Sequence, residues 1–171
     1  MRHCGAIAAR VHEWPLDRCD WAIVRAGATR GYARGRKRWK AARASGDAET
    51  LHEWRKRVKD LWYHHRLLRE LWPGVMKAYA GEADRLGELL GDDHDLAVLD
   101  AFLEAHDGNL DTRADLVSVR GLIQGRRAEL QDEARALGRR LYADSPKAFD
   151  RRLEACLRAA LDRRPPATAA A

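Results

Sequence analysis

The stretch LHEWRKRVKDLWYHHRLLREL, residues 51–71, contains no Gly or Pro and is rich in residues that favour an α-helix. At about 100° per residue, one broad side of this helix collects apolar groups and one histidine, and we expect that side to face a core. Its members are Leu51, Trp54, Val58, Leu61, Trp62, His65 and Leu68. The stretch therefore predicts an amphipathic helix.

The opposite side of the same helix carries cationic and hydroxyl side chains in a straight row about 20 Å long. We call it the basic row; its members are His52, Arg55, Lys56, Lys59, Tyr63 and Arg66. Like charges at this spacing repel one another, so the row predicts a site for an anionic partner. The alternative is a solvated helix face on which Lys and Arg extend into water.

Charge is distributed unevenly along the chain, which has a net charge of +6. Residues 25–66, the basic segment, hold 13 Lys and Arg against 4 Asp and Glu, a net of +9. Residues 82–115, the acidic segment, hold 11 acids against 2 arginines, a net of −9. Either the two segments pair within the fold, or the basic segment forms a groove for a polyanion.

Composition places the chain among soluble globular proteins with one core. It has 171 residues, of which 46% are hydrophobic and 34% charged. No apolar run approaches the roughly 18 residues of a membrane span, and no signal peptide is evident. Three scattered cysteines favour a reducing compartment, hence the cytoplasm. A CxxC zinc signature, a phosphate-binding glycine loop and a GxSxG elbow are all absent from the sequence.

Helical spacing and turn residues predict an all-α antiparallel bundle of about six helices with short loops. The first predicted helix starts at Asp17 or Asp20 and runs to 43. The other five cover residues 51–71, 75–90, 92–106, 112–142 and 146–161. Gly91 is predicted to end the third helix. Residues 1–16 read as a linker or stub, 17–162 as the bundle, and 163–171 as a disordered tail.

The first predicted helix has a basic side of its own, which carries Arg30, Arg34, Lys37 and Arg38. Because consecutive helices joined by a short turn pack antiparallel, we expect this side and the basic row to line one groove. Glycines at 27, 31 and 35 lower helix stability but allow close approach of another helix or of a ligand.

The cluster Asp92, Asp93, His94 and Asp95 has three interpretations. Acids at a helix N-terminus cap free N–H groups, and this is the first interpretation. The second is that these acids orient cations of the basic row. The third is a divalent metal site built on His94 and Asp95, which would make the protein a metal-dependent phosphohydrolase.

The aromatic residues argue against nucleic acid as the partner. Trp21, Trp39, Trp54 and Trp62 fall on core sides of their helices, and only Tyr63 accompanies the basic row. Stacking of bases needs exposed aromatic rings among the cations. The sequence therefore favours a ligand that has phosphates and no bases.

Two elements of the sequence resemble the CHAD family, the conserved histidine α-helical domains. One is HEWRKRVK at 52–59, which has the pattern HxxRKxxK, and the other is LGDDHD at 90–95, which has the pattern LGxxxD. The basic stretch GYARGRK at 31–37 also resembles the helix that leads into this motif. The resemblance is good over 25–103 and loose over the last two helices.

This resemblance implies an all-α protein with two pseudo-symmetric halves around a basic cavity. It also implies binding of inorganic polyphosphate with no catalysis and no cofactor, in the cytoplasm and in some cases at polyphosphate granules. Carried over by motif, the polyphosphate ligands are His52, Arg55, Lys56 and Lys59, with Arg34 and Lys37 as weaker matches. Arg30, Tyr63 and Arg66 join the candidate site through their helical positions.

The chain contains one HxxRK element, whereas the family pattern has two. It therefore resembles the C-terminal half of a CHAD domain. Either an N-terminal half lies outside this sequence, or two copies pair as a homodimer and rebuild the cavity. Besides the phosphohydrolase, a further alternative is an interaction bundle in which basic and acidic segments pair between chains.

Overall fold

The described part of the protein consists of antiparallel helices. The computed structural model describes residues 20–106 and 113–162, and the side chains of 20–106 and 116–162. The elements are α2 (Trp21–Ser45), α3 (Ala48–Leu67), the short 3-10 helix η2 (Arg69–Leu71), α4 (Pro73–Ala105), α5 (Arg113–Leu141) and α6 (Pro146–Asp162). These residues contain no strand, which confirms the all-α prediction. The predicted stub and tail lie outside the described residues.

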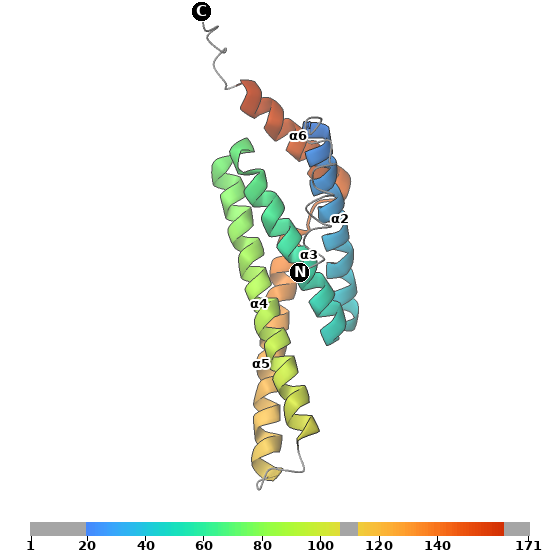
Figure 1. Ribbon diagram of the computed structural model, residues 1–171, viewed down its shortest axis with the longest axis vertical. Helices are drawn as coiled ribbons and strands as arrows, with labels where there is room; N and C mark the ends of the chain where they lie inside the picture. Colours follow the sequence, from blue (N-terminus) through green and yellow to red (C-terminus); the bar gives the residue numbers. More distant parts are fainter. Residues whose placement is uncertain (1–19, 107–112, 163–171) are drawn as a thin grey trace, which may run out of the picture.

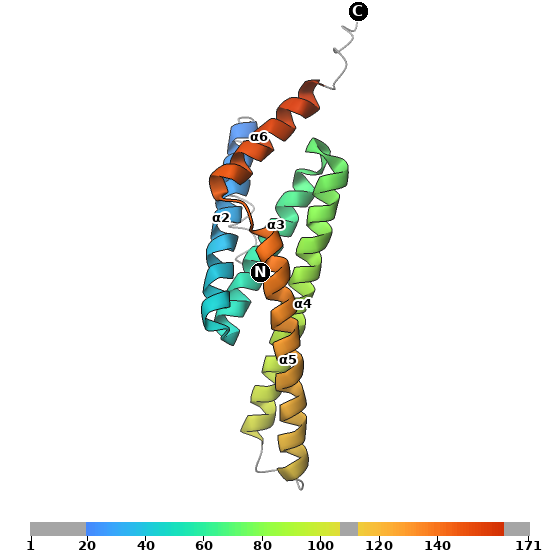
Figure 2. The same ribbon diagram turned by 180° about the vertical axis from the view of Figure 1, so that it is seen from behind.

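Helix α3 is central to the arrangement of the bundle. It packs against α2 on one side and α4 on the other, while α5 packs against α4 and α6 against α2 (Figures 1 and 2). The second half of α4 and the first half of α5 extend beyond α2 and α3 as a two-helix arm. None of the helices within 20–106 and 113–162 has the length and hydropathy of a membrane span.

Local capping interactions set the helix boundaries. The Asp20 carboxylate accepts a hydrogen bond from the Ile23 amide at 3.1 Å, and that of Asp47 accepts one from Thr50 at 2.8 Å. Gly46 has a φ of 67°, and its N–H donates to the Ala42 carbonyl, which ends α2. Asp20 is one of the two residues at which the sequence predicts the first helix to start, whereas α3 starts three residues before the predicted 51.

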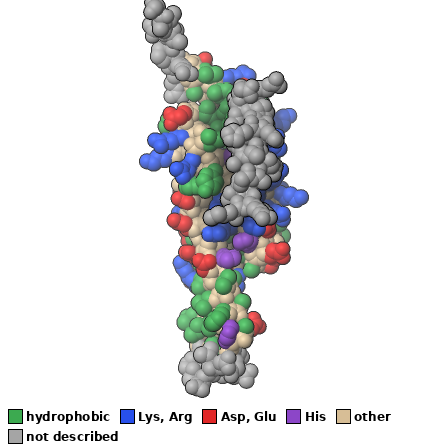
Figure 3. Space-filling model, viewed as in Figure 1, with side chains coloured by type: hydrophobic (Ala, Val, Ile, Leu, Met, Phe, Trp, Pro, Cys, Tyr) green, Lys and Arg blue, Asp and Glu red, His purple; other side chains and the backbone are tan. Residues whose placement is uncertain are grey.

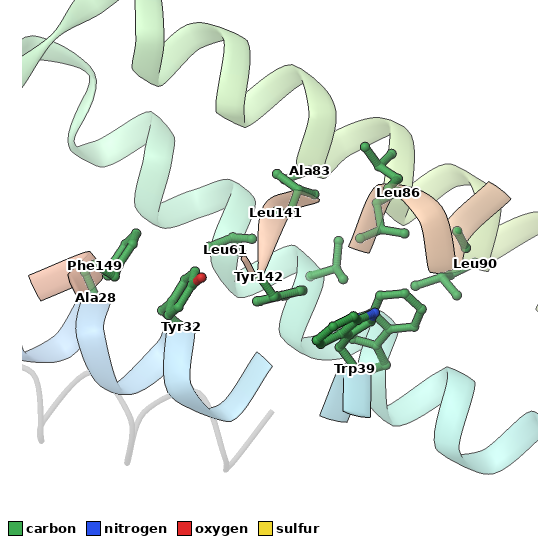
Figure 4. Close-up of a cluster of buried hydrophobic side chains, with 14 of the residues drawn as sticks. Ala28, Tyr32, Trp39, Leu61, Ala83, Leu86, Leu90, Leu141, Tyr142 and Phe149 are labelled. Carbon is green, nitrogen blue, oxygen red and sulfur yellow. The ribbon is translucent and has the colours of Figure 1, made fainter. Parts of the chain in front are cut away.

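The apolar side of α3 is buried in the core as predicted. Leu51, Trp54, Val58 and Leu61 are at most 2% exposed, and only Trp62 is half-buried. Aromatic rings from α2 and the α5–α6 region complete this core, with Tyr32 stacked on Phe149 and close to Tyr142 (Figure 4). Full burial of each large apolar side chain contributes roughly 1.5–3 kcal/mol to folding.

Two predictions about the middle of the chain are wrong. The helices predicted at 75–90 and 92–106 form one continuous helix, α4, so the described residues contain five α-helices. Gly91 does not end a helix, because Gly46 is the only described glycine with the positive φ that such an ending uses. Asp92, Asp93 and Asp95 cannot cap a helix N-terminus, because they lie in the interior of α4.

Gly138 permits close packing of two tryptophan rings in the core, and we predict that Gly138→Ala destabilises the protein. A Cβ atom at this position would lie 2.6 Å from Cζ2 of Trp54 and 2.8 Å from Cδ1 of Trp39. Overpacking of this kind lowers the free energy of unfolding by about 1–3 kcal/mol, which chemical denaturation would measure. Gly125→Ala is the matched control in the same helix, because nothing lies within 4 Å of its Cβ position. It should stabilise the protein by roughly 0.5–1 kcal/mol, and equal effects of the two changes would contradict this account.

Burial of His65 predicts a loss of stability in acid. Burial lowers the pKa of this imidazole to about 4, against 6.5 when exposed, and its ring stacks on Tyr79. Between pH 6.5 and 4, His65 therefore binds a proton in the unfolded chain and stays neutral in the folded protein. The contribution of His65, about 3 kcal/mol, is present above pH 6.5 and is lost as the pH falls towards 4. Denaturation of His65→Phe across this range should show a flatter pH dependence than the wild type; an unchanged dependence would exclude His65 as the cause.

Candidate anion-binding site

Two grooves follow α3, one on each side of its outward face. The α3/α4 groove has a volume of about 450 Å³, and the α2/α3 groove about 380 Å³. Tyr63, which is 62% exposed, stands between them and lines both. The basic side of α2 and the basic row therefore border different grooves, because the outward ridge of α3 separates them.

The structure divides the predicted site residues among these surfaces. Arg30 and Arg34 line the α2/α3 groove, together with Asp60 and His64. Arg55 and Lys59 line the α3/α4 groove. Lys37, Lys56 and Arg66 are exposed and contribute to the lining of neither groove.

Arg55 is held against α4 by two glycines. Its Nε donates to the Gly87 carbonyl at 3.4 Å, and a Cβ atom on Gly91 would lie 3.3 Å from its Nη2. Gly91 therefore allows the guanidinium to lie flat against the helix. Gly91, which belongs to the motif that resembles the family pattern, therefore packs against Arg55 and does not end a helix as predicted.

The other members of the basic row differ in how far their charges are already satisfied. Lys56 Nζ lies 2.6 Å from Glu53 Oε1, whereas Lys59 makes no ion pair with any described residue. The Arg66 guanidinium lies 4.5 Å from the ring centre of Trp62, a cation–π contact. Lys59 is therefore the member of the row whose charge is most available to a ligand.

His52 and His94 bring α3 and α4 together at the end of the row. Their ring centroids are 5.0 Å apart, and His94 Nδ1 lies 3.2 Å from Asp95 Oδ1. His52 Nδ1 is buried and has no hydrogen-bond partner among the described residues. Those residues include no group of three or more His, Cys, Asp or Glu able to hold a metal ion, so the structure lends no support to a metal site at His94 and Asp95.

Several acids of the acidic segment form ion pairs with α5. Asp93 is buried and accepts hydrogen bonds from Arg127 at 3.1 Å and Gln131 at 2.8 Å. Arg120 binds Asp100 at 2.8 Å, and its hydrogen bond holds the pKa of that carboxyl below its usual value. Within 20–106 and 116–162, no ion pair joins the basic segment to the acidic segment. Four other acids of the acidic segment, Asp84, Glu88, Asp92 and Asp95, line the α3/α4 groove opposite Arg55 and Lys59, so the two segments face each other there without a direct ion pair.

His64 is a residue of the α2/α3 groove that the sequence analysis did not select. Its ring fits against α2 only because position 31 is glycine, where a Cβ atom would lie 2.5 Å from His64 Cε1. Burial lowers the pKa of His64, while Asp60 opposes that shift, and Nδ1 has no partner among the described residues. The glycines of α2 at 27, 31 and 35 are the sequence feature that pointed to this contact. They predict that another group approaches α2 closely, but they do not identify that group as His64.

Figure 3 shows how charge is arranged on the face that includes α3. Lys and Arg lie on both the α2 edge and the α4 edge of this face, while hydrophobic side chains gather on the arm. The exposed apolar residues of α4 in the arm are Val98, Leu99 and Phe102. The arm therefore differs from the rest of this face in being largely apolar.

Comparison with known proteins identifies the family. The model of the CHAD domain matches residues 2–104, a range that includes all of α2 and α3 and nearly all of α4. No curated protein and no solved structure matches the chain. The matched range holds both grooves and covers more than half of the sequence, and the chain therefore belongs to the CHAD domain family.

Proposed function

We propose that this protein binds inorganic polyphosphate as a non-catalytic module, through the α2/α3 groove and the outward face of α3. The observation that carries the proposal is the lack of ion pairs at Arg30, Arg34, Lys37 and Lys59 with any described acid. Uncompensated cations this close together repel one another, and an anion along them removes that repulsion. The family of the chain supports a chain of phosphates as that anion.

Each cation suits a different part of the task. Arg30 and Arg34 are one helical turn apart on α2 and offer planar guanidinium groups that bind phosphate oxygens in pairs. Lys59 and Lys37 supply point charges that tolerate several positions of the chain. Several such contacts in a row bind a long polyphosphate well and a single phosphate poorly.

One HxxRK element supplies one wall of the cavity that the resemblance implies. We therefore propose that the facing wall comes from a second half-domain, either in a longer polypeptide or in a second copy of this chain. Light scattering with and without polyphosphate distinguishes these arrangements. Only pairing of two copies of this chain raises the number of protein chains in each particle.

Removing the two α2 arginines should weaken binding and its dependence on salt. We predict that Arg30→Ala with Arg34→Ala lowers polyphosphate affinity at least tenfold, because each charge-assisted bond contributes roughly 1.5–3 kcal/mol. A plot of log affinity against log salt should also become less steep, since fewer counterions are displaced. Isothermal titration calorimetry at several salt concentrations provides both values. Arg139→Ala with Lys147→Ala removes the same charge from exposed positions outside both grooves and is the control. Equal losses in the two variants would show that only net charge matters.

His64 should make binding stronger in mild acid. Its pKa is below 6.5 in the free protein, and phosphate beside it raises that pKa in the complex. Affinity should therefore rise as the pH falls through the pKa of the complex and level off below the pKa of the free protein. The other titratable or charged groups of this groove are Arg30, Arg34, Asp60 and Tyr63.

Proton uptake measures this coupling directly. Calorimetry of polyphosphate binding at one pH, in two buffers of different ionisation enthalpy, should show uptake by the wild type. His64→Gln should take up fewer protons and show a flatter pH dependence of affinity. If the variant takes up as many protons as the wild type, another group is responsible.

A further inference from the structure

The α2/α3 groove contains a carboxylate among its cations. Among the described residues, its charged and titratable lining groups are Arg30, Arg34, Asp60, Tyr63 and His64. An unprotonated phosphate oxygen and the carboxylate of Asp60 both only accept hydrogen bonds, and their charges repel. The phosphate group that fits beside Asp60 is therefore one that still carries a proton.

Asp60 has one oxygen with a partner on its own helix and one oxygen left for a ligand. Arg57 Nη1, three positions earlier on α3, lies 2.7 Å from Asp60 Oδ2. The other oxygen, Oδ1, accepts no hydrogen bond from a described residue. The side chain of Asp60 is 37% exposed, so a ligand in the groove can reach it. Arg57 therefore fixes the carboxylate and leaves Oδ1 able to accept from a ligand.

Glycines of α2 leave space for such a ligand between the helices. Gly27 and Gly31 line the groove one turn apart, and a Cβ atom at Gly27 would meet nothing within 4 Å. At Gly31 the ring of His64 takes the corresponding space. The volume of about 380 Å³ is within the range of sites for small ligands, so the groove holds a short part of a phosphate chain.

The end of a polyphosphate chain is the part that carries a hydrogen-bond donor near neutral pH. Interior phosphates are fully ionised, whereas a terminal phosphate has a second ionisation with a pKa of about 6. Its P–O–H group can donate to a carboxylate, while its other oxygens accept from guanidinium groups. Interior phosphates offer acceptors alone, and these suit the cations on the outward face of α3.

We propose that the α2/α3 groove binds the protonated terminal phosphate of a polyphosphate chain. This subsite rests on the polyphosphate binding proposed above, and it makes Asp60 the residue that distinguishes the chain end from interior phosphates. The terminal P–O–H donates to Asp60 Oδ1, and the other terminal oxygens accept from Arg30 and Arg34. Because Tyr63 lines both grooves, the chain passes this ring and its next phosphates reach Lys59.

Ligands with blocked ends test this subsite, because a methyl ester replaces the donor on the terminal phosphate. At about pH 5.5, below the terminal pKa of about 6, most free ends carry one proton and have the same charge as a methylated end. Calorimetry of the full chain in magnesium-free buffer would compare tetrapolyphosphate with its ester methylated at both ends. We expect the free-ended ligand to bind at least roughly fivefold more tightly. Equal affinities, or tighter binding of the ester, would overturn the proposal.

The variant Asp60→Asn separates the hydrogen bond from the bulk of the methyl group. An amide both accepts and donates, so the variant should bind the two ligands within about twofold of each other. Its affinity for the ester should rise, since one negative charge is lost from the groove. A preference for free ends that persists in Asp60→Asn would arise from steric exclusion and would overturn the role of Asp60. Circular dichroism at the same pH checks that the variant remains folded.

Asp132→Asn is the matched control for this variant. Asp132 also pairs with an arginine three positions away, Arg135, and it lines neither groove. The control removes the same charge and should keep the wild-type preference for free ends. Loss of the preference in Asp132→Asn would show that net charge is the cause and would overturn the proposal.

Failure of this subsite and failure of polyphosphate binding are separable. If a long polyphosphate binds while the two short ligands bind equally, the end subsite is wrong and polyphosphate binding stands. If neither long nor short polyphosphate binds, both proposals are wrong. Orthophosphate carries the same P–O–H group without a chain, and we expect it to bind more weakly than tetrapolyphosphate. Equal binding of orthophosphate would assign the groove to free phosphate and overturn the proposal.

Discussion

The close contact between Trp54 of α3 and Gly138 of α5 holds the buried side of α3 in the core. Trp54 is fully buried, and no side chain larger than hydrogen fits beneath its ring at position 138. Because this contact holds one side of α3 in the core, the opposite side must face outward with its cations. The basic row is therefore exposed as a consequence of packing on the other side of the same helix.

Helix α5 also binds carboxylates of α4. Arg127 and Gln131 bind the buried carboxylate of Asp93, and Arg120 binds Asp100. These contacts use acids that would otherwise compete for the cations of α2 and α3. An anion-binding surface and an acidic helix can then coexist in one small bundle, since Asp93 and Asp100 of α4 have partners on α5.

The two grooves differ in the charge of the residues that line them. In the α2/α3 groove, arginines and a buried histidine meet one carboxylate, Asp60, and the chemistry favours an anion. In the α3/α4 groove, two cations face a carboxylate wall beside aromatic rings. Tyr63 belongs to both surfaces, so the two grooves are neighbours across a single side chain.

The sequence by itself determined the helices, the buried side of α3 and the outward position of the basic row. These follow from periodicity and caps, which depend on residues within a few positions of each other, as at Asp47 and Thr50. The tertiary structure alone decided that α4 continues through Gly91, that Asp93 binds Arg127, and that the cations border two grooves. It also left Phe102 of the arm 57% exposed. These outcomes depend on contacts between residues far apart in the sequence, and local spacing contains no information about which helix lies opposite.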